Sequence, residues 1–223
     1  MTPAELGWLL LWGTVAGLDL VSVPQAMFCR PFVAGTVAGA ILGDPAGGLA
    51  VGAVLELFAL EVLPVGAARY PDFGPAAIAG AAVAAGTAGL HGVGFAVTIG
   101  MIVAVLGDTS IHLMRRVNVA AVRRHAAALD AGDARVVAQI QRMGLARDAL
   151  RSVLLTAFGL GLAIAARLAP PLSGGGARML DVVVIGAGLA AAATGALRLS
   201  GSGRNLAWLA VGVAGGSLVV VAR

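Results

Sequence analysis

Stretches of about 20 apolar residues recur along this chain, and they constrain its fold more than any other feature. Three of them follow one another in the second half, at 153–172, 180–199 and 206–221. At 1.5 Å per residue, a helix of this length crosses the hydrocarbon core of a bilayer, which is about 30 Å thick. We therefore expect an all-α integral membrane protein.

The composition favours the same class of protein. Of the 223 residues, 59% are hydrophobic and only 12% are charged, which is about half the charged share of a soluble domain. So few charges would not cover the surface of a soluble fold, whereas apolar side chains can face lipid. The 33 glycines let helices approach closely in a membrane. A soluble, alanine-rich helical protein is the weaker alternative.

The basic residues are concentrated in one segment. All 15 are arginines, and eight of them lie between Arg115 and Arg151. This clustering is typical of a cytoplasmic loop rather than of a nucleic-acid-binding surface. We expect residues 115–152 to form this loop, with two amphipathic helices joined by a turn at 130–133. The connector 198–204 then lies on the same side, and Arg223 lies outside.

Two further membrane segments, at 76–90 and 92–114, are expected to precede the basic loop. Asp108 and His112 lie four residues apart, so they share one helix face. Such a pair could hold a metal ion or relay a proton. The simpler interpretation is that both side chains reach water at the cytoplasmic end of the segment.

The first 75 residues do not divide into clean membrane spans. The apolar segment 4–23 contains Asp19 and ends at Pro24, segment 31–43 is too short to cross a bilayer, and segment 47–63 carries Glu56 and Glu61. Short, charged segments interrupted by glycine and proline are typical of broken helices that line a substrate site.

The predicted fold is therefore two N-terminal re-entrant or broken helical hairpins, followed by about five transmembrane helices with a central cytoplasmic amphipathic loop. The expected parts are 1–75 with the substrate site, 76–114 with two membrane segments, the loop 115–152, and 153–223 with three transmembrane helices.

Charged and polar residues gather in the first part of the chain, where a charge is costly to place in a membrane. A carboxylate there could accept hydrogen bonds from two neighbouring hydroxyls of a sugar. For Arg30 and Asp44 a structural ion pair is the simpler interpretation. For Glu56 a functional role is favoured, since no basic residue is near it in the sequence. The group consists of Arg30, Asp44, Glu56, Glu61, Arg69, Tyr70 and Asp72.

An ordered series of short motifs in this region resembles the IIC subunit of the mannose/sorbose family of the bacterial phosphotransferase system (PTS). The motifs are Arg30-Pro31, Leu42-Gly43-Asp44, Leu55-Glu56-Leu57, Pro64-Val65-Gly66 and Pro71-Asp72.

The resemblance implies a carrier in the bacterial inner membrane that moves a hexose or related sugar inward. It also implies a second membrane subunit, IID, in a trimer of IIC–IID pairs, and soluble IIA and IIB proteins that phosphorylate the sugar. Glu56 and Asp72 would contact the sugar. Arg30, Pro31, Gly43, Asp44, Glu61 and Gly66 would lie near the site in more structural roles.

Some positions depart from the family's pattern. Cys29 replaces a frequent histidine, Val54 a frequent threonine, and Glu61 a frequent glycine. These changes leave two alternatives open. One is a regulatory or docking membrane subunit of an incomplete PTS that no longer transports, and the other is an unrelated small-solute permease.

No catalytic motif is visible in the sequence. It contains no phosphate-binding loop, no paired metal ligands, and no nucleophile with an evident base. His125 is the one histidine expected to be exposed in the cytoplasm. We therefore expect no enzyme activity, cofactor, metal ion or nucleic-acid partner for this chain.

Overall fold

The computed structural model describes residues 1–62, 69–87, 91–200, 207–208, 210–212 and 214. Every regular element in these ranges is a helix, which confirms an all-α protein. Four helices are long and apolar enough to cross a membrane: Pro3–Val21, Gly92–Arg124, Ala134–Ala166 and the first 23 residues of Gly174–Ser200. Most of the predicted last span, 206–221, as well as residues 201–204 of the connector before it and Arg223, lie outside the described ranges.

Helix α1 (Pro3–Val21) begins at a capping box, in which Thr2 and Glu5 bond each other's backbone N–H groups. It runs unbroken past Asp19, where the sequence predicted an interruption. The helix tolerates this residue because the carboxylate points into the following loop. It accepts hydrogen bonds there from the backbone N–H groups of Ala26 and Cys29.

Helices α2 (Pro31–Ile41) and α3 (Pro45–Ala59) form a short antiparallel hairpin, which we call the glycine hairpin. With 11 and 15 residues, each is shorter than a bilayer-spanning helix, as predicted. Gly43, at φ +79°, turns the chain between them, a conformation that favours glycine.

The two helices of the glycine hairpin touch through their backbones. Gly35 and Gly39 of α2 face Gly48 and Gly52 of α3, so both helices use a pair of glycines four residues apart. A Cβ atom on Gly48 would lie 2.3 Å from the carbonyl oxygen of Gly35 and 2.8 Å from the Cα atom of Gly39. The packing therefore leaves no room for even a methyl group.

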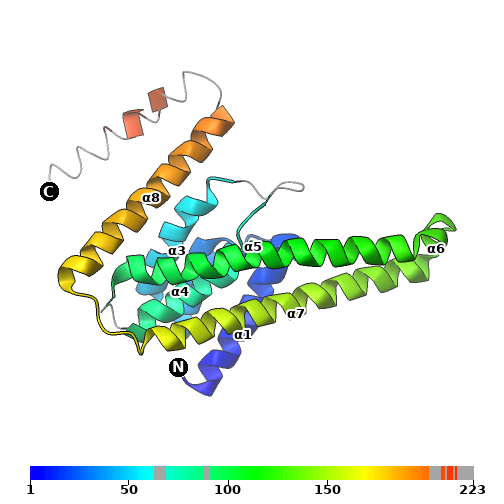
Figure 1. The fold of residues 1–223 in the computed structure, drawn as a ribbon, viewed down its shortest axis with the longest axis horizontal. Helices are drawn as coiled ribbons and strands as arrows, with labels where there is room; N and C mark the ends of the chain where they lie inside the picture. The colour runs from blue at the N-terminus through cyan, green and yellow to red at the C-terminus, as the bar shows by residue number, and fades with distance from the viewer. Residues whose placement is uncertain (63–68, 88–90, 201–206, 209, 213, 215–223) are drawn as a thin grey trace.

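Helix α4 (Phe73–Thr87) is the centre of the fold. It packs against α1, α2, α3, α5 and α7, and Figure 1 shows it enclosed by them. All residues from Phe73 to Val83 are buried. At 15 residues it is shorter than a bilayer-spanning helix. The described part of the apolar segment expected at 76–90 therefore belongs to a short, largely buried helix.

Helices α5 (Gly92–Arg124) and α7 (Ala134–Ala166) are antiparallel and much longer, with 33 residues each. Figure 1 shows them extending together beyond the other helices to a tip formed by the short α6 (Ala126–Asp130). We call the part that projects, residues 112–147, the basic hairpin.

The two amphipathic helices expected at 115–152 are present, and they continue α5 and α7 without a break. For α5 the physical reason lies in the sequence, because no glycine or proline interrupts the chain between Gly107 and His125. The predicted turn is present, with Gly132 at φ +75°.

Helix α8 (Gly174–Ser200) packs against α5 and α3. The predicted break around Pro170 and Pro171 is confirmed, since α7 ends at Ala166 and α8 begins at Gly174. The Asp181 carboxylate accepts a hydrogen bond of 2.6 Å from the backbone N–H of Gly94, in the first turn of α5. This bond satisfies one of the free N–H groups at that helix terminus.

Candidate functional site

Glu56 lies in the last turn of α3, at the open end of the glycine hairpin, and forms an ion pair with Arg30. Arg30 is the residue before α2, so the antiparallel arrangement brings the two side chains together. The backbone N–H of Phe32 also donates to Glu56 Oε2 over 3.3 Å. The side chains of Arg30 and Glu56 are 28% and 20% exposed, so a ligand can reach this pair.

The Arg30–Asp44 ion pair suggested by the sequence does not form. Asp44 lies at the opposite end of the hairpin, where it caps α3 by accepting a hydrogen bond from Gly47 N–H over 2.9 Å. Pro31 occupies the first position of α2. The turn of the hairpin is therefore shaped by Gly43 and Asp44, whereas Pro31 starts α2 at the charged end.

Asp72 lies just before α4 and is fully buried. Its Oδ2 atom accepts a hydrogen bond of 2.7 Å from Arg151 of α7, and Arg151 also donates to Asp148 over 2.9 Å. We call these three residues the buried charge triad. Asp72 is therefore not exposed at a loop end.

Further polar groups surround the triad. Arg151 donates to the Gly17 carbonyl oxygen over 3.2 Å and to Ser110 Oγ over 3.3 Å, while Ser22 donates to Asp148. The triad thus joins α1, α5 and α7 to the segment before α4. Asp72 Oδ1 has no hydrogen-bond partner among the described residues.

Sequence reasoning missed the role of Arg151, because it counted this residue among the arginines of a solvated loop. The arginine is 8% exposed and lies inside α7. One signal was available. Asp148 and Arg151 are three residues apart, so they lie on one helix face, and an apolar stretch follows them directly. A buried ion pair at the edge of a membrane span fits that pattern.

Tyr70 lies two residues before Asp72 and is buried. Its ring packs edge-on against Phe73 with a centroid distance of 5.6 Å. The candidate site therefore has a half-buried carboxylate, Glu56, and a buried one, Asp72, which is flanked in the chain by this aromatic pair.

Asp108 and His112 are brought together as their spacing predicted, with 3.3 Å between His112 Nδ1 and Asp108 Oδ1. Arg69 donates twice to the other carboxylate oxygen, over 3.0 and 2.8 Å. Among the described residues, no cluster of three or more potential ligands could hold a metal ion. In this structure the Asp108 carboxylate forms an ion pair with Arg69.

The remaining predicted residues lie at the edge of this region. Glu61 follows α3 and is 3.9 Å from Arg198 of α8. Gly66 lies outside the described residues. Near these residues the backbones of α3 and α8 meet, because a Cβ atom on Gly195 would lie 2.3 Å from the Leu60 carbonyl oxygen.

Residues 6–169 match the family described as the sorbose-specific IIC component of the PTS. This match covers α1 to α7, including both carboxylates of the candidate site. The chain belongs to this family.

Curated relatives carry related names. The mannose-specific EIIC component of Escherichia coli K12 is 26% identical over 151 residues, which are 68% of this chain and 56% of that protein. The sorbose-specific EIIC component of Klebsiella pneumoniae is 34% identical over 127 residues, 57% of this chain and 46% of that protein. The matched part thus spans about half the length of these relatives.

Two solved structures share the fold. A chain described as a membrane protein superposes with a TM-score of 0.78 at 20% identity, over 99% of this chain and 95% of that one. A chain of the mannose transporter ManYZ in complex with microcin E492 gives 0.63 at 22% identity, over 97% and 87%.

The IIC components of this family are multi-pass proteins of the bacterial inner membrane, and so is this chain. The relatives are transport subunits of a PTS.

Proposed function

We propose that this chain is the sugar-translocating IIC subunit of a mannose/sorbose-type, phosphoenolpyruvate-dependent PTS. It moves a hexose or related sugar inward, and soluble IIA and IIB proteins phosphorylate the sugar. A IID subunit pairs with it in the membrane, in a trimer of IIC–IID pairs. The basic hairpin faces the cytoplasm, as the positive-inside rule predicts. Family membership supports the class of function.

The observation that carries the sugar site is the Arg30–Glu56 pair at the open end of the glycine hairpin. Two groups orient the carboxylate, the Arg30 guanidinium and the Phe32 backbone N–H, yet the side chain stays partly exposed. Its free lone pairs can accept hydrogen bonds from adjacent sugar hydroxyls. A site for a neutral, polar solute needs such fixed acceptors and no covalent chemistry.

Asp72 is the second proposed contact. Its Oδ1 atom is a buried acceptor without a partner among the described residues, and buried polar atoms are normally hydrogen-bonded. A sugar hydroxyl that reaches this oxygen would complete its hydrogen bonding. Because Asp72 is fully buried beside Arg151, this contact requires the segment before α4 to move during transport.

The test is sugar binding to the purified chain, co-expressed with its IID-like subunit, using a panel of radiolabelled hexoses and amino sugars. We expect saturable binding of at least one sugar, and about a 10- to 100-fold weaker affinity in Glu56→Gln. This range corresponds to the loss of one charge-assisted hydrogen bond, worth about 1.5–3 kcal/mol.

Glu61→Gln is the matched control, since it neutralises a glutamate five residues further along, in a pair that is more exposed. We expect it to keep the wild-type affinity. Unchanged affinity in Glu56→Gln would remove Glu56 from the site. A folded complex that binds no sugar of the panel would contradict the carrier function and favour a regulatory subunit.

A further inference from the structure

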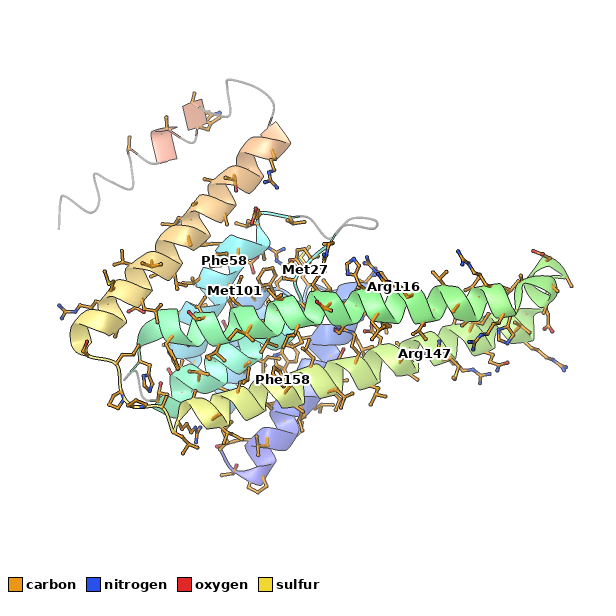
Figure 2. All side chains as sticks on the ribbon, viewed as in Figure 1. Met27, Phe58, Met101, Arg116, Arg147 and Phe158 are labelled. Atoms are coloured by element: carbon orange, nitrogen blue, oxygen red, sulfur yellow. The ribbon has the colours of Figure 1, made fainter. Side chains whose placement is uncertain are left out.

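Two adjacent arginines, Arg115 and Arg116, lie where α5 leaves the packed body of the protein. Figure 2 shows Arg116 on the stretch of α5 that extends beyond the shorter helices. The ion-paired arginines of the described chain are Arg30, Arg69, Arg151 and Arg198, so neither of the two is among them. Their positive charges are therefore available to an external anion.

The position along α5 places both arginines at the level of lipid headgroups. From Gly92, about 20 residues of helix cross the hydrocarbon core, which brings its far boundary close to Ile111. Arg115 and Arg116 follow after about another 6–8 Å of helix. The polar headgroup layer is about 5–8 Å thick on each side of the core.

A cavity beside Arg115 offers room for a polar headgroup. Its volume is about 410 Å³, within the range of small-molecule sites. It lies between the loop after α1, α5 and α7, and its polar lining comes from Ser22, Gln25, Arg115 and Asn118. No carboxylate lines it. On the other side of Arg115, a second groove of about 460 Å³ carries His112, Arg116 and Arg123.

Large apolar side chains are exposed on either side of these two cations along α5. Leu113 is 63% exposed, and Val117, one turn further along, is 44% exposed. Aliphatic side chains that flank arginines are typical of helices at the boundary between headgroups and acyl chains.

From this combination of depth, charge, cavity and apolar neighbours, we infer that Arg115 and Arg116 bind the phosphate group of an anionic phospholipid. The phosphate lies at the groove that Arg115 and Arg116 both line, and the rest of the headgroup extends into the cavity on the Arg115 side. The acyl chains run along the apolar side chains of α5. The lipid belongs to the leaflet on the side of the basic hairpin. This inference does not depend on which solute the protein carries.

The test compares lipid retention in two double variants of the full chain, by native mass spectrometry with phosphatidylglycerol or phosphatidylcholine. We expect Arg115→Gln/Arg116→Gln to weaken retention of phosphatidylglycerol by about 30-fold, from about 1 kcal/mol for each arginine near the surface. Arg124→Gln/Arg135→Gln removes the same charge nearer the tip of the basic hairpin, from two exposed arginines outside the lining of the cavity and of the groove. It should retain phosphatidylglycerol like the wild type.

Two further variants guard against a folding defect. Arg115→Lys/Arg116→Lys keeps the charge and should restore most of the retention. Arg116→Gln alone changes an exposed residue and should give an intermediate loss. Equal loss in both glutamine double variants would overturn the proposed site in favour of diffuse attraction. Equal retention of phosphatidylcholine and phosphatidylglycerol by the wild type would overturn the charge recognition.

A protein partner is the competing outcome. If purified IIB from the same system lost affinity for Arg115→Gln/Arg116→Gln while phosphatidylglycerol retention stayed unchanged, the two arginines would be a protein docking site and the lipid proposal would be wrong.

Discussion

The glycine hairpin and the long α5–α7 pair differ in where they place charged side chains within a membrane protein. The glycine hairpin brings two backbones into contact and keeps its charged pair at an open, half-exposed end. The long pair instead packs around a charge triad that is shielded from solvent. The Glu56 carboxylate is accessible to a ligand as it stands, whereas the Asp72 carboxylate holds helices together and would meet a ligand only after the segment before α4 has moved. The difference therefore separates a preformed contact from one that requires a rearrangement.

The largest expected effect comes from breaking the buried charge triad. Arg151→Met leaves Asp72 and Asp148 buried without their cation, which costs about 3–5 kcal/mol. We expect a strongly lowered melting temperature and yield in detergent, measured by size-exclusion chromatography after heating. Arg142→Met, on the exposed part of α7, is the matched control and should melt like the wild type.

A triple variant sharpens this first prediction. Adding Asp72→Asn and Asp148→Asn to Arg151→Met removes the uncompensated charges, so part of the lost stability should return. If Arg151→Met alone melted at the wild-type temperature, the triad would not hold the helices together.

A smaller effect is expected from the glycine hairpin. Gly48→Ala places a methyl group 2.3 Å from the Gly35 carbonyl oxygen, and overpacking of this kind costs about 1–3 kcal/mol. Gly161→Ala in α7 meets no atom within 4 Å, so it should be neutral or slightly stabilising. The melting temperatures of the two variants measure the difference. Equal melting temperatures would mean that moving the two helices of the glycine hairpin apart does not lower the stability of the protein.

The smallest effect is expected at the Glu61–Arg198 pair. Its charged atoms are 3.9 Å apart and its side chains are 39% and 69% exposed. Exposed ion pairs contribute less than about 1 kcal/mol, so Arg198→Gln should leave the melting temperature almost unchanged. A clear loss of stability would show that α8 is fastened to the glycine hairpin by this pair, despite the long distance.

The sequence predicted the features that depend on local patterns. Pro31, Gly43 and Asp44 fixed the short helices and the turn of the glycine hairpin, and Pro170 and Pro171 marked the start of the connector before α8. Their effects act within a few residues, so no tertiary information was needed.

Partners that are distant in sequence were not predictable in the same way. The sequence suggested an ion pair between Arg30 and Asp44, whereas Arg30 pairs with Glu56 in the structure. Nothing in the local sequence shows which side chains meet at each end of a hairpin. Arg151 was counted as a solvated arginine, since the burial of its guanidinium depends on Asp72, which is 79 residues away. The burial of the short helix α4 was not predictable either, because a buried helix and a membrane span are both uniformly apolar.

The continuity of α5 and α7 has a mechanical consequence. Each is a rod about 50 Å long, of which about 20 Å projects as the basic hairpin beyond the hydrocarbon core. A helix without a break turns as one body, so a sideways push at α6 tilts the buried segments about the membrane boundary as a lever does about its fulcrum. Arg151 lies close to that fulcrum, where a tilt of the rod displaces side chains least.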